Sequence, residues 1–103
     1  MGTVKLSADG DDAGTIKLPA KLDIAAAAHL HAALIERMGQ DISLSGSEVE
    51  YVGGRCLDVL LAAKATCMSA GTKMTVLSPS GAMVHDLAIL GSSPETLSTG
   101  DAP

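Results

Sequence analysis

Three stretches of this chain carry apolar residues at helical spacing, and a glycine directly follows each one. The stretches cover 23–38, 55–70 and 80–90, and the glycines are Gly39, Gly71 and Gly91. Glycine just past the last helical residue is a common helix end, because it accepts a left-handed backbone. Shorter segments between the helices alternate apolar and polar residues, as β-strands do. This order predicts an α/β domain with right-handed crossovers in its parallel part.

The strand-like segments predict the composition of the sheet. They are Thr3–Leu6, Thr15–Leu18, Ile42–Leu44, Val49–Val52 and Lys73–Leu77. Turn residues fill 9–14, so the first two segments are expected to form an antiparallel hairpin. We therefore expect a mixed four- to five-stranded sheet, with 42–44 as a central strand and 49–52 leading into a turn. The three helices are expected to pack on this sheet.

The apolar positions of each helix predict its buried side, and Asp23 is the expected N-cap of the first helix. The expected inward residues are Ile24, Ala27, Ala28, Leu34, Ile35 and Met38, then Leu57, Leu60, Leu61, Ala65 and Met68, and finally Met83, Val84, Leu87 and Leu90. The chain contains no Phe or Trp, and Tyr51 is its one aromatic residue. The core is therefore expected to be aliphatic.

The length of 103 residues predicts a single domain. All the periodic segments fall within residues 1–91. Residues 92–103 are polar and contain almost no apolar side chains, which is typical of a disordered tail. The domain is therefore predicted to end at Gly91.

The net charge of −5 argues against nucleic acid as a partner, because nucleic acid favours basic surfaces. No apolar run approaches the roughly 20 residues that span a bilayer, so no membrane insertion is expected. The chain start lacks the apolar stretch of a signal peptide.

Cys56 and Cys67 would lie about 16 Å apart along one helix and cannot pair. Two free thiols predict a cytoplasmic location.

No set of residues in the sequence predicts catalysis, a metal site or a cofactor. His29 and His31 lie about 200° apart around a helix and cannot converge on one metal. His85 stands apart from both. No Cys-x-x-Cys, His-x-x-x-His or glycine-rich phosphate loop is present. The chain is therefore not expected to be an enzyme, and its histidines are expected to be structural.

Cys56 allows two interpretations. It falls in the first turn of the second helix, where the helix dipole and the adjacent Arg55 favour a thiolate. A reactive or redox-sensing thiol is one interpretation. The other is a small side chain packed where the helix starts close to the sheet, since no histidine is placed to act as a base.

The turn from Val52 to Cys56 is the most informative surface of the chain. Gly53 and Gly54 place unobstructed backbone N–H groups at the positive end of a helix. Such a position attracts anions or the acceptor groups of a partner. The alternative is a tight turn in which glycine supplies a positive φ. Either way, Arg55 is expected to project from the surface.

Several segments together resemble the STAS domain (sulfate transporter and anti-sigma factor antagonist). The resemblance covers residues 3–91, and its order and spacing are more specific than any one string. The strings are LPAKLD at 18–23, ISLSGSEVEYV at 42–52, CLDVLLAA at 56–63, AGTKMTV at 70–76, SGAMVHDL at 80–87 and LG at 90–91. The resemblance implies a STAS-like fold.

The resemblance also implies a role for the turn. In the family this turn reads Asp-Ser-Ser-Gly-Leu or close to it, and a partner kinase phosphorylates its first serine. Gly53 stands at the aspartate position and Gly54 at the phosphoserine position. Gly54 has no hydroxyl, so the phosphoryl switch of anti-sigma factor antagonists cannot operate at this position.

The Val-Gly-Gly-x-Cys-Leu form of the turn resembles the small STAS proteins associated with chemotaxis genes in alphaproteobacteria. This resemblance implies a non-catalytic regulatory module that binds a chemotaxis histidine kinase or a related signalling protein. The expected partner-binding residues are Gly53, Gly54, Arg55, Cys56 and Asp58. An anti-sigma factor antagonist-like partner-switching protein and the STAS subunit of a lipid-transport ABC complex are alternatives. A sensor of anions or small ligands is an alternative of another class.

Overall fold

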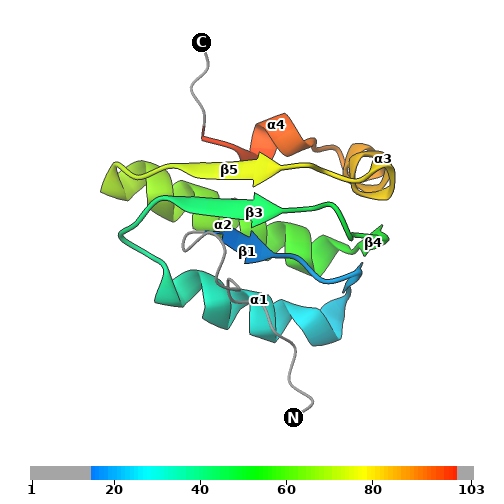
Figure 1. The fold of residues 1–103 in the computed structure, drawn as a ribbon, viewed down its shortest axis with the longest axis horizontal. Helices are drawn as coiled ribbons and strands as arrows, with labels where there is room; N and C mark the ends of the chain where they lie inside the picture. Colours follow the sequence, from blue (N-terminus) through cyan, green and yellow to red (C-terminus); the bar gives the residue numbers. More distant parts are fainter. Residues whose placement is uncertain (1–14, 100–103) are drawn as a thin grey trace.

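The computed structural model describes residues 15–99. Its elements are β1 (Thr15–Lys17), β2 (Lys21–Leu22), α1 (Ile24–Glu36), β3 (Ile42–Ser45), β4 (Tyr51–Val52), α2 (Gly54–Ala70), β5 (Met74–Leu77), α3 (Gly81–Ile89) and α4 (Pro94–Leu97) (Figure 1). The α/β class predicted from the sequence is confirmed. The predicted strand at Thr3–Leu6 and the hairpin built on it lie outside the described residues.

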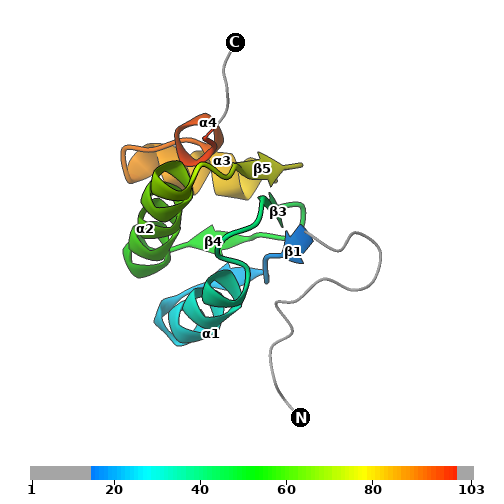
Figure 2. The same cartoon turned by 90° about the vertical axis from the view of Figure 1, so that its left-hand side faces the viewer.

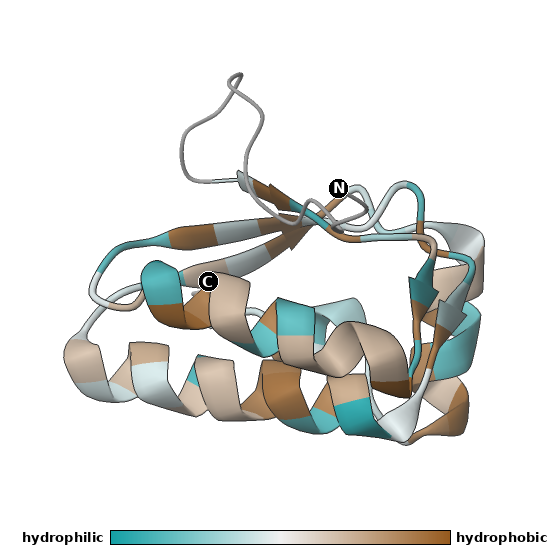
Figure 3. Ribbon diagram, turned by 90° about the horizontal axis from the view of Figure 1, so that it is seen from below, coloured by the Kyte–Doolittle hydropathy of each residue, from teal (hydrophilic) through white to brown (hydrophobic). Residues whose placement is uncertain are grey.

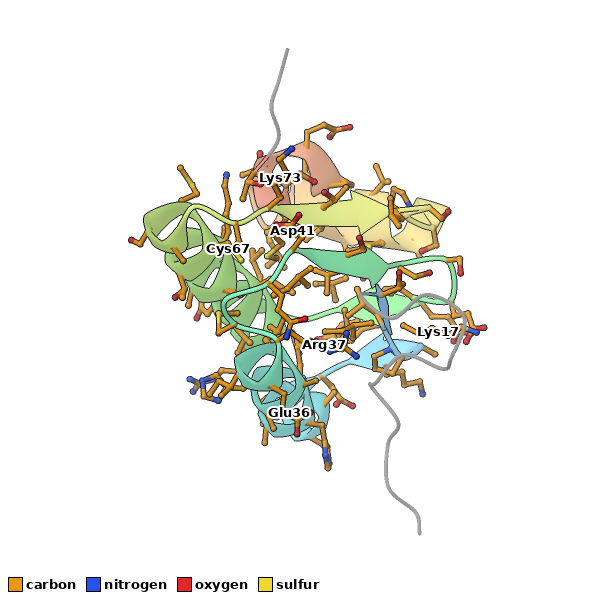
Figure 4. The ribbon with its side chains drawn as sticks, turned by 60° about the vertical axis from the view of Figure 1, so that its left-hand side comes forward. Lys17, Glu36, Arg37, Asp41, Cys67 and Lys73 are labelled. Atoms are coloured by element: carbon orange, nitrogen blue, oxygen red, sulfur yellow. The ribbon has the colours of Figure 1, made fainter. Side chains whose placement is uncertain are left out.

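The described strands form two sheets, both parallel, and the predicted antiparallel strand that would make the sheet mixed lies outside the described residues. One has the order β1-β3-β5, and the other pairs β2 with β4. The central position predicted for residues 42–44 is confirmed, because β3 lies between β1 and β5. Asp41 and Lys73 align the starts of β3 and β5: Ile42 N–H donates to Lys73 O at 2.8 Å and Lys73 N–H to Asp41 Oδ1 at 3.0 Å (Figure 4).

The three-stranded sheet has one apolar and one polar face. The strand register places Ile16, Leu44 and Val76 side by side on the inner face. It places Thr15, Ser43 and Thr75 side by side on the opposite face, because side chains alternate along a strand. Helices α1 and α2 lie next to each other over the inner face (Figure 2). The buried core they form with the sheet contains no aromatic side chain, as expected.

The predicted N-cap of α1 and the predicted ends of α2 and α3 are confirmed, whereas α1 ends at Glu36 with Arg37 as its C-cap, two residues before the predicted end. The Asp23 carboxylate caps α1 by accepting the N–H of Ala26 at 3.0 Å. Gly39, Gly71 and Gly91 have φ values of +94°, +78° and +82°, in the region that favours glycine.

The predicted buried sides are only partly correct. The residues that fill the core from the helices are Ala26, Ala27, Leu30 and Leu34 on α1, Cys56, Leu57, Leu60, Ala63 and Cys67 on α2, and Met83 and Leu87 on α3. Several residues predicted to be buried are instead exposed: Ile24, Ala28, Ile35, Leu61, Ala65, Met68, Val84 and Leu90. Alanines occur on every side of α1, so the apolar pattern does not define a single stripe.

The prediction of a disordered tail from residue 92 is wrong for residues 92–99. Pro94–Leu97 form α4, and Leu97 is fully buried in the main core. The polar residues that follow cover the free edge of β5. Met74 N–H donates to Thr99 Oγ1 at 3.0 Å, and Val76 N–H donates to Ser98 Oγ at 3.1 Å. These hydroxyls satisfy edge groups that would otherwise be open to another strand, so the packed unit extends to Thr99.

Leu97→Ala is expected to lower the free energy of unfolding by about 2–4 kcal/mol, because it removes a buried side chain and leaves a cavity. Urea denaturation followed by circular dichroism measures this loss. Glu95→Ala on the exposed side of α4 is the matched control and is expected to change stability by less than about 0.5 kcal/mol. Equal effects of the two substitutions would contradict the packing of α4 on the core.

Candidate functional site

The short β2–β4 pair brings the beginnings of α1 and α2 together. Leu22 and Val52 are paired in the parallel register, and each helix begins two residues later. Gly53 N–H donates to Leu22 O at 2.9 Å, and the Cys56 thiol donates to Asp23 O at 3.3 Å. The two N-terminal helix ends therefore lie side by side at one end of the molecule (Figure 1).

The two helix ends differ in how their backbone donors are satisfied. Helix α1 has a side-chain cap in Asp23, whereas α2 has Gly53 as N-cap and no side-chain cap. The first backbone bond of α2 runs from Leu57 N–H to Gly53 O at 3.1 Å. Within residues 15–99, the N–H groups of Gly54, Arg55 and Cys56 meet no acceptor. The start of α2 thus offers backbone donors at its positive end.

The two glycines of the turn have different roles. Neither has a positive φ, so the positive-φ explanation of this turn is wrong. Gly53 is needed for close approach, because a Cβ there would lie 3.0 Å from Tyr51 Oη and 3.3 Å from Leu22 O. A Cβ at Gly54 would have no heavy atom within 4 Å. Packing therefore explains the glycine at 53 but not the glycine at 54.

Helix α3 holds the turn from the other side. The Asp86 carboxylate accepts the Val52 N–H at 3.0 Å, and Ser80 Oγ donates to Val49 O at 2.6 Å. The sequence analysis missed Asp86. The available signal was a lone acidic residue on an otherwise uncharged helix, since 81–89 contains no other Asp, Glu, Lys or Arg.

The structure separates the five residues predicted to bind a partner. Gly54, Arg55 and Asp58 are exposed, and Gly53 is half-buried. Cys56 is 0% exposed, so its predicted contact with a partner is wrong in this conformation. We call Gly53, Gly54, Arg55 and Asp58 the turn surface. Tyr51, 48% exposed, borders it.

The Cys56 thiol is in the environment expected of a packed residue. Burial, and secondarily the nearby Asp23 carboxylate, raises the pKa of the Cys56 thiol above its usual value. A raised pKa keeps the thiol protonated near neutral pH, and only the thiolate is a good nucleophile. Cys67 is buried on the same helix, and neither cysteine is in a disulfide. The structure thus favours the packed interpretation over a reactive thiol.

The described residues provide no assembled metal site. His29, His31 and His85 are exposed, and no three His, Cys, Asp or Glu side chains in the described residues come close enough to hold a metal ion. None of the helices within residues 15–99 has the length and apolar character needed to span a bilayer. Two depressions, of about 320 Å³ and 170 Å³, lie along α1 and are not lined by the turn surface.

The fold and site define an α/β domain with an exposed helix start that lacks a side-chain cap. A protein-family model described as "Mlab, STAS domain" matches residues 6–93. The chain therefore belongs to the STAS domain family. Comparisons with curated proteins and with solved structures give no match.

The substitutions Gly53→Ala and Gly54→Ala are expected to have different effects on the free energy of unfolding. Gly54→Ala is expected to leave the free energy of unfolding unchanged or raise it by up to about 1 kcal/mol, because alanine favours a helix and meets no neighbour. Gly53→Ala is expected to lower it by about 1–3 kcal/mol, because the Cβ crowds Leu22 O and Tyr51. Thermal and urea unfolding of both variants, side by side, provides the measurement. A Gly54→Ala variant as unstable as Gly53→Ala would contradict this assignment.

The cysteines are expected to react with a thiol reagent only when the protein opens. Near neutral pH, the native protein should be labelled far more slowly than the protein in denaturant, because both thiols are buried and Cys56 stays protonated. Timed labelling with mass spectrometry of the peptides measures each site. Labelling of Cys56 in the native protein as fast as in denaturant would restore the reactive interpretation.

Proposed function

We propose that this chain is a non-catalytic regulatory module that binds a signalling protein through the turn surface. The observation that carries the proposal is the exposed start of α2, where the backbone N–H groups of the exposed Gly54 and Arg55 have no acceptor within the described residues. Arg55 adds a positive group and Asp58 a negative one, both exposed. A partner that presents acceptors to the helix start and a carboxylate to Arg55 fits this arrangement.

The residue at position 54 supports binding that is not controlled by phosphorylation of this turn. A hydroxyl-bearing side chain would fit there, since a Cβ would have no neighbour within 4 Å. Glycine at the first position of a helix is also less favourable than most residues. The absence of the family's phosphorylatable serine is therefore not imposed by packing. We infer that the turn can bind the partner at all times, because no phosphorylation at position 54 switches this binding off.

The partner we propose is a chemotaxis histidine kinase or a related signalling protein. The support is the Val-Gly-Gly-x-Cys-Leu form of the turn, which resembles the small STAS proteins associated with chemotaxis genes. The two unpaired thiols fit a reducing cytoplasm, where such kinases signal.

Reversing the charge of Arg55 is expected to weaken partner binding about tenfold or more, because a like charge would then face the partner's acceptors. The tagged protein is used to capture its partner from the native host, and the captured kinase is then titrated by biolayer interferometry. Lys73→Glu is the matched control, since Lys73 is exposed at the opposite end of the molecule (Figures 1 and 4). Capture of no signalling protein, or equal binding by Arg55→Glu and wild type, would reject the proposal.

Gly54→Asp is a second arm of the same experiment. A carboxylate at the first position of α2 would fold without strain and interact with the open N–H groups. We expect this variant to keep its thermal stability and to lose partner affinity, as a phosphoserine would cause in the relatives. Unchanged affinity would show that the helix start is not part of the interface.

The description of the matching family favours a second candidate, the STAS subunit of a lipid-transport ABC complex. The same capture experiment separates the two, because this candidate requires a membrane-associated ATPase in place of a kinase. A partner-switching protein of the anti-sigma factor antagonist type would instead release an anti-sigma factor. A sensor of free anions would give heat with phosphate or nucleotide alone in calorimetry.

A further inference from the structure

The outer side of α1 is largely apolar, with His29 and His31 as its exposed polar residues. Ile24 is 78% exposed and Ile35 is 55% exposed. Three alanines between them, Ala25, Ala28 and Ala32, are also exposed. No Asp, Glu, Lys or Arg occurs from residue 24 to residue 35. Figure 3, which views the molecule from the side of α1, shows both long helices largely in the colours of apolar residues. A solvated helix normally carries charges on this side.

The residues on this side follow the spacing of a helix-packing seam. Ile24, Ala28, His31 and Ile35 are separated by four, three and four residues, and all four are exposed. That spacing keeps side chains on one line and lets them interlock with a second helix. Ile24 and Ile35 differ by only about 20° around the helix. We call these four residues the α1 seam.

We propose that the α1 seam binds the α1 seam of a second copy of this chain, with the two helices antiparallel about a two-fold axis. The seam is complementary to itself in this orientation. Ile24 lies opposite Ile35 of the second copy, and the small Ala28 lies opposite the larger His31 of the second copy. A two-fold contact requires this self-complementarity, because the same surface is used twice. Alanine at the centre allows the helices to approach closely.

Charges at the ends of α1 favour the antiparallel orientation. It places the positive N-terminal end of each helix beside the negative C-terminal end of the other. Glu36 lies exposed in the last turn, on the outer side of α1 (Figure 4), and Lys21 lies exposed just before the first turn. In the antiparallel pair, Glu36 of one copy lies near the helix start and Lys21 of the other. A parallel pair would instead place like ends together.

A groove beside the seam provides further apolar area for the second copy. The groove has a volume of about 320 Å³ and lies between α1 and α2. His31 and Ile35 of the seam line it, together with Leu34, Met38, Val59, Ala62, Ala63 and Thr66. None of these residues is an Asp, Glu, Lys or Arg. The seam and the groove thus form one surface.

The oligomeric state tests the proposal directly. Sedimentation equilibrium of the full chain is expected to give a concentration-dependent mass approaching twice 10.3 kDa. Ile35→Glu is expected to raise the dimer dissociation constant at least about tenfold, because a charge would be buried in the contact. Ile89→Glu on α3 is the matched control, since Ile89 is 70% exposed. This variant is expected to have the same measured mass as the wild type. A wild-type chain that stays monomeric at all concentrations would overturn the proposal.

Cysteine cross-linking tests the orientation without relying on a disruptive variant. Ile24→Cys and Ile35→Cys, mixed as two single variants, are expected to form a cross-linked dimer with a mild thiol oxidant. Either variant alone is expected to form little cross-linked dimer, because the same residue of the two copies lies about 16 Å apart in the antiparallel pair. Cys56 and Cys67 are buried and do not compete. Efficient cross-linking by each variant alone, and not by the mixture, would overturn the antiparallel arrangement.

The dimer does not depend on the function proposed for the turn. Ile35 lies at the end of α1 remote from the turn surface, so Ile35→Glu is expected to bind the captured partner as well as wild type. Arg55→Glu is expected to dimerise normally. Loss of both partner binding and dimerisation in either variant would show that the turn surface and the α1 seam belong to the same interface.

Discussion

The candidate site depends on the hydrogen bond between Gly53 N–H and Leu22 O, at 2.9 Å. This bond continues the two-residue pairing of β2 with β4 and brings the starts of two helices together. A side chain at residue 53 would crowd this bond, since a Cβ would lie 3.3 Å from the same carbonyl oxygen. The Cys56 thiol links the turn to Asp23 at the start of α1, and the Asp86 carboxylate holds it from α3. A turn fixed by three elements loses little conformational entropy on binding.

The features that the sequence predicted well are the local ones. Asp23 caps α1, and Gly71 and Gly91 mark the ends of α2 and α3, because each depends on the backbone of its own segment. The helix at 55–70 and the central strand at 42–44 were likewise identified from periodicity alone. The position of the turn surface followed from the same local signals, since two glycines precede a strongly periodic helix.

The features that the sequence did not predict depend on contacts between distant segments. Ser98 and Thr99 are polar residues typical of a tail in the sequence, and only the folded structure shows that their hydroxyls accept hydrogen bonds from the edge of β5. Asp86 has no apparent role until α3 lies beside Val52. The inward side of α1 was misassigned because alanine is compatible with core and surface alike. Cys56 was placed in the interface because its position in the sequence does not reveal its burial under the start of α1.

The misassigned side of α1 leads to the arrangement of the two proposed surfaces. Ile24 and Ile35 were expected in the core because they belong to the set of apolar residues that recur at helical spacing. They are exposed, and the proposed second copy would cover their apolar area. An antiparallel pair formed through this face places the two turn surfaces at opposite ends of the paired helices. A partner that is itself two-fold could then bind both turns, and the second contact would be intramolecular. The affinity for that partner would then depend on dimerisation. Dimerisation would thus control binding, which phosphorylation at Gly54 cannot do.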